Sequence, residues 1–185
     1  MKIGMEQARA AIQEAEEIGE RSARLRRYAL TSPYFLVWGT IWVLAFALCE
    51  WQPAQCGMIW TIFNIVGIST SLALLLSRSA TRGLTLASAR YIAIPAALFL
   101  FFLAAFHIMQ PSEPQQYSAF IVLTAAMIYV VGGFFLGKWR IAVTGIALAA
   151  VTFLGYTTLY DHFFGWMSVC GGGILFAAGL WLKRV

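Results

Sequence analysis

Two histidines and two carboxylates stand where apolar segments of the sequence end: His107, His162, Glu50 and Asp161. Imidazole and carboxylate groups bind divalent transition metals, so these four residues are the candidate metal ligands. None of them has a recognisable ligand spacing to another, and we expect them to be dispersed, each solvated at its own loop. The sequence therefore predicts no bound metal, and nothing in it calls for a cofactor.

Catalysis finds little support in the chain. Asp161 and His162 are adjacent, and adjacent side chains on a loop rarely orient one another as a general-base pair. The sequence also lacks HExxH, CxxC, GxSxG and phosphate-loop motifs. An enzyme is not excluded, but a protein without catalytic activity is the favoured interpretation.

Cys49 and Cys56 flank a connection of six residues between two apolar segments. Disulfides persist in oxidising compartments such as the bacterial periplasm, so a disulfide is expected if this connection faces that side. Closing so short a loop would add modest stability. The alternative is a pair of free thiols.

The composition indicates that these residues belong to a membrane protein. The 185 residues are 61% hydrophobic and 11% charged, whereas soluble domains carry about 25% charged residues. Six uncharged stretches are each long enough to cross a hydrocarbon core of ~30 Å. Their unbroken apolar runs favour helices over the alternating strands of a membrane barrel. We expect helices at 33–50, 55–77, 91–109, 117–137, 141–159 and 163–182.

These spans predict an all-α, polytopic membrane protein. Short connections pair the six helices into three consecutive hairpins, with a cytoplasmic helix at 1–30 and the six-helix transmembrane domain at 31–185. In lipid, small residues let helix backbones approach closely. Small-xxx-small spacing occurs in three spans, at Gly67 and Ser71, Gly133 and Gly137, and Gly145 and Ala149.

Basic residues predict the orientation of the spans. All 13 Lys and Arg residues fall in the N-terminal stretch, in the connections after the second and fourth spans, or after the last span. Loops rich in Lys and Arg stay in the cytoplasm, so both termini are expected on the cytoplasmic side of a bacterial inner membrane. The charged residues of the other connections are Glu50, Glu113 and Asp161, which are all acidic. Bases dispersed in this way do not form the basic face of a nucleic-acid-binding protein.

Residues 5–29 are predicted to form an amphipathic helix, either a solvated surface helix or one that docks on a partner. A narrow stripe along it has the pattern that meets another helix: Ala11, Ala15, Ile18, Ser22, Leu25 and Ala29. The arginines just before the first span are expected to contact anionic lipid headgroups: Arg21, Arg24, Arg26 and Arg27. Ser32 and Pro33 are typical of a helix N-cap and first helical position, so a new helix is expected to begin there.

Polar groups inside the spans are few and uncharged, which disfavours ion-coupled transporters and pumps. Asn64 is the only amide at depth, and it either hydrogen-bonds across to another helix or holds a polar ligand together with Thr61. Gly171, Gly172 and Gly173 either pack against a neighbouring helix or form a hinge or smooth wall beside a ligand. These five residues are the candidate solute site or interhelical polar site.

Three segments carry a resemblance to a known group of proteins: TSPYFLVWGTIW at 31–42, GWMSVCGGG at 165–173 and GLWLKR at 179–184. They look like segments of small uncharacterised bacterial inner-membrane proteins with six helices. The resemblance spans nearly the whole chain. It implies a bacterial inner membrane and brings no activity with it.

Function is therefore expected to rest on association. The expected protein is a scaffold, regulatory or accessory subunit in the lipid bilayer, forming a homo-oligomer or binding another membrane protein. The alternative is a channel or uncoupled carrier for a small neutral or apolar solute, whose path would be lined by Thr61, Asn64 and the triple glycine.

Overall fold

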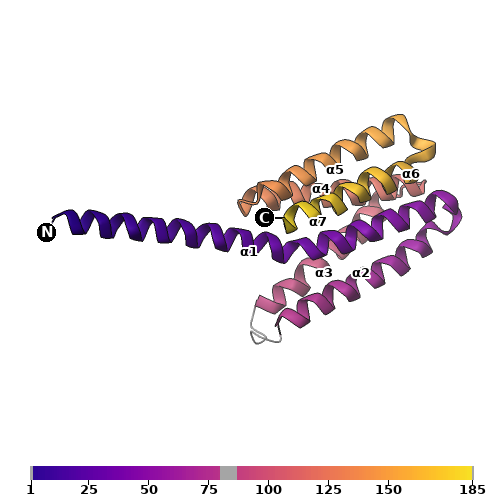
Figure 1. Cartoon of the computed structure of the whole chain (residues 1–185). Coiled ribbons are helices and arrows are strands. Elements are labelled where there is room, and N and C mark those ends of the chain that lie inside the picture. The colour runs from indigo at the N-terminus through magenta and orange to yellow at the C-terminus, as the bar shows by residue number, and fades with distance from the viewer. Residues whose placement is uncertain (1, 80–86, 185) are drawn as a thin grey trace.

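The computed structural model describes residues 2–79 and 87–184, with side chains described for 30–77, 96–184 and a few earlier positions. Its secondary structure is helical throughout these ranges (Figure 1). The elements are α1 (Lys2–Trp51), α2 (Cys56–Ser79), α3 (Ala87–Met109), α4 (Pro114–Phe135), α5 (Trp139–Thr158), α6 (Phe163–Trp166), the π-helical segment η3 (Met167–Gly172) and α7 (Gly173–Lys183). Two 3₁₀ turns, η1 (Pro53–Gln55) and η2 (Tyr160–His162), precede α2 and α6.

Five helical stretches are long and apolar enough to cross a membrane. They are Leu30–Trp51, Pro53–Ser77, Pro114–Phe135, Trp139–Thr158 and Tyr160–Lys183, and α3 contributes a shorter apolar stretch at Ala96–Met109. The all-helical, membrane-spanning class predicted from composition is therefore confirmed. The predicted helix ends agree with those of the observed helices to within a few residues, except at the start of the first helix.

The predicted helix start at Ser32 and Pro33 is wrong. α1 runs as one helix of 50 residues with Pro33 in its interior. Proline is tolerated inside membrane helices when neighbouring helices and Ser or Thr side chains satisfy the freed backbone groups. Ser32 does not cap α1, because its buried hydroxyl donates a hydrogen bond of 2.7 Å to the carbonyl oxygen of Gly179 in α7.

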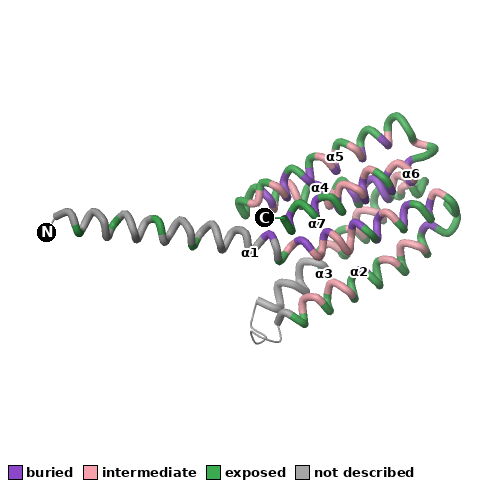
Figure 2. The backbone as a smooth tube through the Cα atoms, viewed as in Figure 1, coloured by how far each residue is buried: buried purple, intermediate pink, exposed green. Residues whose placement is uncertain are grey.

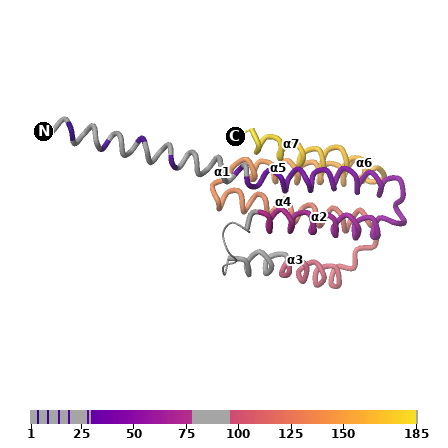
Figure 3. The backbone as a smooth tube through the Cα atoms, turned by 60° about the horizontal axis from the view of Figure 1, so that its bottom comes forward, coloured from indigo at the N-terminus to yellow at the C-terminus, as the bar shows by residue number. Residues whose placement is uncertain are grey.

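Helix packing joins segments that are distant in sequence. The most extensive contacts are those of α4 with α5 and of α1 with α7 and η3, while α2 packs on α1 over a smaller area. The most extensive contacts therefore join helices of different predicted hairpins. In Figure 3 the described half of α3 lies at the edge of the bundle, beyond α2 and α4 as seen from α7.

Glycines make the closest helix contacts. A Cβ atom at Gly39 of α1 would lie 2.5 Å from the backbone nitrogen of Phe176, and one at Gly145 would lie 2.6 Å from the carbonyl oxygen of Ala126. Gly133 packs in the same way on Ala142. The small-residue seams predicted at Gly133 and Gly145 are thus confirmed as close contacts between α4 and α5.

Gly137 has a different role from the one its spacing predicted. It follows the end of α4 with a φ of +63°, in the left-handed region that glycine adopts without steric cost. Nothing lies within 4 Å of a Cβ at this position. Gly137 therefore terminates the helix and does not continue the packing seam.

Candidate functional site

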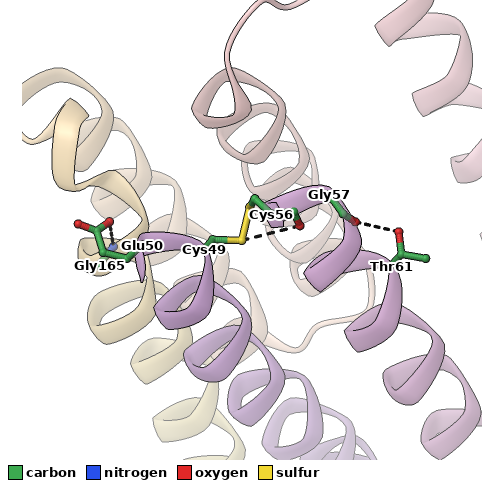
Figure 4. Close-up of a disulfide and its surroundings, with 6 residues drawn as sticks. All are labelled: Cys49, Glu50, Cys56, Gly57, Thr61 and Gly165. Carbon is green, nitrogen blue, oxygen red and sulfur yellow. Dashed lines mark hydrogen bonds between the residues drawn. A yellow bond between two sulfur atoms is a disulfide. The ribbon is translucent and has the colours of Figure 1, made fainter. Parts of the chain in front are cut away.

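The bundle has two ends with different chemistry. At the terminal end, the C-terminus lies beside the point where α1 enters the bundle (Figure 1). At the opposite end, Cys49 and Cys56 form a disulfide with a Cα–Cα distance of 4.8 Å (Figure 4). Both cysteines are buried. This disulfide end joins the last turn of α1 to the first turn of α2.

Glu50 connects the disulfide end to the last span. Its Oε1 atom lies 2.9 Å from Nδ1 of His162, and its Oε2 atom accepts a hydrogen bond of 2.8 Å from the backbone N–H of Gly165 (Figure 4). Free N–H groups in the first turn of a helix attract a carboxylate. The expectation that all four candidate metal ligands are solvated separately is therefore wrong for Glu50 and His162.

His107 and Asp161 do not join this pair. Both side chains are exposed, His107 near the end of α3 and Asp161 in η2. Among the described residues, no three His, Cys, Asp or Glu side chains gather as a metal-ligand group. The contact of Glu50 with His162 therefore joins the end of α1 to the start of the last span.

Arg140 joins three aromatic side chains at the terminal end, a role that no sequence pattern indicated. Its guanidinium carbon lies 4.8 Å from the ring centre of Trp181, 5.7 Å from that of Trp139 and 5.8 Å from that of Tyr28. Its Nη1 also donates a hydrogen bond of 3.2 Å to the carbonyl oxygen of Trp181. Arg140 therefore ties the starts of α5 and of the first span to the end of α7.

One residue of the triple glycine lies against α1. Gly172 is buried, and a Cβ there would lie 2.7 Å from the backbone nitrogen of Val43. Ser168, one turn earlier, donates a hydrogen bond of 2.7 Å to the carbonyl oxygen of the same valine. Gly171 is buried beside Met167, whereas nothing lies within 4 Å of a Cβ at Gly173. Of the two interpretations, the structure favours close packing.

Asn64 makes no hydrogen bond to another helix within the described part of the chain. Its side chain is exposed on α2, and the hydroxyl of Thr61 donates to the carbonyl oxygen of Gly57 one turn earlier, at 2.8 Å. The described residues therefore provide no partner for the interhelical bond expected of Asn64. The five residues proposed as one polar site lie on two separate surfaces, the exposed face of α2 and the packed face of the last span.

A cavity of about 330 Å³ opens between the ends of α3, α4 and α5 nearest the disulfide end. Its walls are mostly apolar and include four aromatic rings, those of Phe106, Phe120, Phe153 and Tyr156. Asn64 and the glycines of the last span do not line it. Sequence patterns did not indicate this cavity, because the aromatic residues come from three different spans.

The four arginines predicted to meet lipid headgroups, Arg21, Arg24, Arg26 and Arg27, lie outside the residues whose side chains the structure describes. Comparison with protein-family models, with curated proteins and with solved structures gives no match to this chain. By its fold the chain is a multi-pass helical membrane protein. Its function has to be inferred from its own surfaces.

Proposed function

We propose that the protein acts by association, as a scaffold, regulatory or accessory subunit of a bacterial inner membrane that self-associates or binds another membrane protein. The chain would be one of the small inner-membrane proteins that it resembles. Its six spans would insert as three consecutive hairpins, with both termini and the amphipathic helix in the cytoplasm. Anionic headgroups would contact the arginines that precede the first span.

The observation that carries this proposal is the length of α1. The helix begins at Lys2, and Figure 1 draws its first half beyond the terminal end of the bundle. At 1.5 Å per residue, the ~27 residues before the first span extend over roughly 40 Å. The positions described there, Gly4, Arg9, Glu14 and Gly19, are all exposed. A stripe of small and apolar residues on a helix that extends beyond the bundle suits docking on a second helix.

The placement of charge supports a cytoplasmic position for this segment. Arg140 and Lys183 lie at the terminal end with α1 entering beside them, while Glu50 and Asp161 belong to the opposite end. Basic residues collect on the cytoplasmic side of membrane proteins. The segment before the first span would therefore face cytoplasmic partners and anionic lipid.

The proposal is tested by placing charge on the stripe. Ile18→Lys combined with Leu25→Lys adds two charges on the stripe, and Gln13→Lys combined with Ala23→Lys adds the same two charges on other faces. We expect the first pair to lower the oligomer or co-purified partner several-fold in native membranes, and the second to leave it unchanged. Equal behaviour of the two pairs, or a chain that is monomeric and without a partner in the membrane, would contradict the proposal.

The cavity favours a second candidate, binding or passage of a small apolar solute. Ala119 lines the cavity and is buried, so Ala119→Phe would fill part of it, whereas Ala150→Phe on the exposed face of α5 would not. Saturable binding of the apolar dye N-phenyl-1-naphthylamine to protein in nanodiscs measures occupancy. Binding that is lost only in Ala119→Phe would place this candidate ahead of association.

A further inference from the structure

We infer that two copies of this chain meet in the membrane through the face of α2 that carries Asn64, and that the two Asn64 amides hydrogen-bond to each other. This inference rests on the proposed function, because it adds to the stripe on α1 a second surface, within the membrane, through which self-association takes place. Asn64 stands next to the midpoint of the span Pro53–Ser77, so its amide lies near the middle of the hydrocarbon core. Its side chain is exposed there and has no partner within the described chain.

An amide in this position requires a partner. Hydrocarbon offers no hydrogen bond, so a lipid-exposed polar group without one is costly. Three other polar side chains of α2 have a partner: the hydroxyls of Thr61 and Ser77 donate to carbonyl oxygens of their own helix at 2.8 and 3.1 Å, and Ser71 accepts from Trp38 Nε1 at 3.2 Å. A hydroxyl can turn back to its own backbone in this way. The amide of Asn64 is exposed and has no hydrogen bond of this kind within the described chain.

The surroundings of Asn64 permit a second helix to approach. Gly57, Thr61, Asn64 and Ile68 are spaced four, three and four residues apart, so they share one side of the helix, and we call them the Asn64 face. All four residues are exposed, and nothing lies within 4 Å of a Cβ at Gly57. Only 6% of an 18-residue apolar stretch of this span is buried inside the chain. Small residues of this kind allow two membrane helices to pack closely.

Symmetry identifies the second helix as another copy of α2. Two copies inserted with the same topology are related by a two-fold axis along the membrane normal, and this axis places each residue opposite itself at the same depth. The contact then requires a side chain that is complementary to itself. An asparagine amide has both donor and acceptor groups, so it meets this requirement, whereas a carboxylate or an ammonium group does not.

Cysteine cross-linking of the full-length protein in native membranes locates the interface. Ile68 is on the Asn64 face, and Val66 is two residues away, about 200° around the helix; the two side chains are 60% and 51% exposed. In a Cys170→Ser background that keeps the Cys49–Cys56 disulfide, Ile68→Cys should form an intermolecular cross-link under oxidation and Val66→Cys should not. Cross-linking at Val66 in place of Ile68 would overturn the assigned face and leave self-association standing.

Substitution of Asn64 tests the hydrogen bond. Interhelical polar contacts in lipid are worth enough that Asn64→Leu should weaken dimerisation roughly 3- to 30-fold, while Asn64→Gln, which keeps donor and acceptor, should dimerise within a factor of about 3 of the native chain. The melting temperature of the Leu variant in detergent separates loss of folding from loss of contact. Unchanged dimerisation of Asn64→Leu, or equal losses for Leu and Gln, would overturn the inference. The inference would also be overturned if Asn64→Leu left the dimer intact and removed only a different co-purified membrane protein. A native chain that is monomeric in the membrane would overturn both this inference and the self-association part of the proposed function.

Discussion

α2 and the last span differ in burial although both cross the bundle with similar length. The span Pro53–Ser77 has 25 residues and is more apolar than Tyr160–Lys183 with 24. In an 18-residue apolar stretch of each span, 6% of the residues are buried inside the chain in the first and 50% in the second. Figure 2 shows the same contrast, with buried positions concentrated on α1 and the last span and exposed positions frequent along α2. Apolarity therefore does not decide which helix is buried here, because lipid solvates an apolar side chain as well as the protein interior does.

Close backbone approach accounts for the difference. The last span brings Gly172 onto Val43 and Gly179 onto Leu36 of α1, where Cβ atoms would lie 2.7 and 2.9 Å from the valine and leucine backbone nitrogens. α2 meets α1 through Gly67, which faces the side chains of Ile41 and Trp38. The last span approaches the backbone of α1, whereas α2 meets side chains of α1. This difference explains why the two helices differ in burial.

The largest expected effect comes from filling a backbone contact. Gly172→Leu should lower the free energy of unfolding by about 3 kcal/mol, because overpacking at Val43 forces the helices apart. Gly173→Leu, one residue later in open space, is the matched control and should change stability little. Thermal unfolding of both variants in the same detergent measures the difference. Equal losses would mean that backbone proximity does not hold the last span in place.

Removing the disulfide should have the next largest effect. In the chain-entropy model, a loop this short contributes about 2 kcal/mol, so Cys49→Ser with Cys56→Ser, or reduction of the native protein, should lower stability by that amount. Because α2 makes few other contacts, its residues should become more accessible when the disulfide is removed. Cys170→Ser serves as the control, since Cys170 is a free cysteine. Unfolding with and without reductant provides the measurement, and an identical curve would show that α2 is held by other contacts.

A smaller loss is expected for Ser168→Ala. The hydrogen bond to the Val43 carbonyl oxygen joins two helices, and removing it should cost about 1 kcal/mol. Thr157→Val removes a hydroxyl that donates to its own helix at Phe153, 2.9 Å away on an exposed face, and should be nearly neutral. Comparison of the two variants by chemical unfolding isolates the interhelical contribution. A Thr157 variant as destabilised as the Ser168 variant would refute it.

The smallest effect is expected at the ion pair of the disulfide end. The side chain of His162 is 79% exposed and that of Glu50 30% exposed, and exposed pairs contribute less than about 1 kcal/mol. His162→Ala should therefore leave the unfolding midpoint almost unchanged. A double-mutant cycle with Glu50→Gln gives the coupling directly. Strong coupling would show that the contact between Glu50 and His162 stabilises this end in addition to the disulfide.

Sequence patterns predicted the spans because charges mark where each helix leaves the membrane, and they predicted that Gly133 and Gly145 would pack because only small residues allow that approach. They did not predict which helices would meet. The pairing of Gly145 with Ala126 depends on the order of helices in the bundle, and spacing within one helix carries no information about it.

The failed predictions involve contacts across long sequence separations. Ser32 has the local pattern of a helix cap, but Gly179, 147 residues away, accepts its hydrogen bond. Glu50 and His162 are 112 residues apart, and only the packing of α6 on α1 brings them together. The residue type of Asn64 indicates that the amide needs a partner, but it does not say on which side of the helix the partner lies.

The π-helical segment determines how the last span would tolerate a change of length. In an α-helix, deleting one residue rotates every following side chain by about 100°, which would turn Gly179 away from Leu36. A π-turn holds one residue more than an α-turn, with i→i+5 hydrogen bonds, so a deletion within Met167–Gly172 can be absorbed by closing the wide turn to an α-turn. Val169 is 74% exposed, so its loss sacrifices the fewest contacts. A chain lacking Val169 should keep α7 seated on α1, while one lacking Ala177 should not.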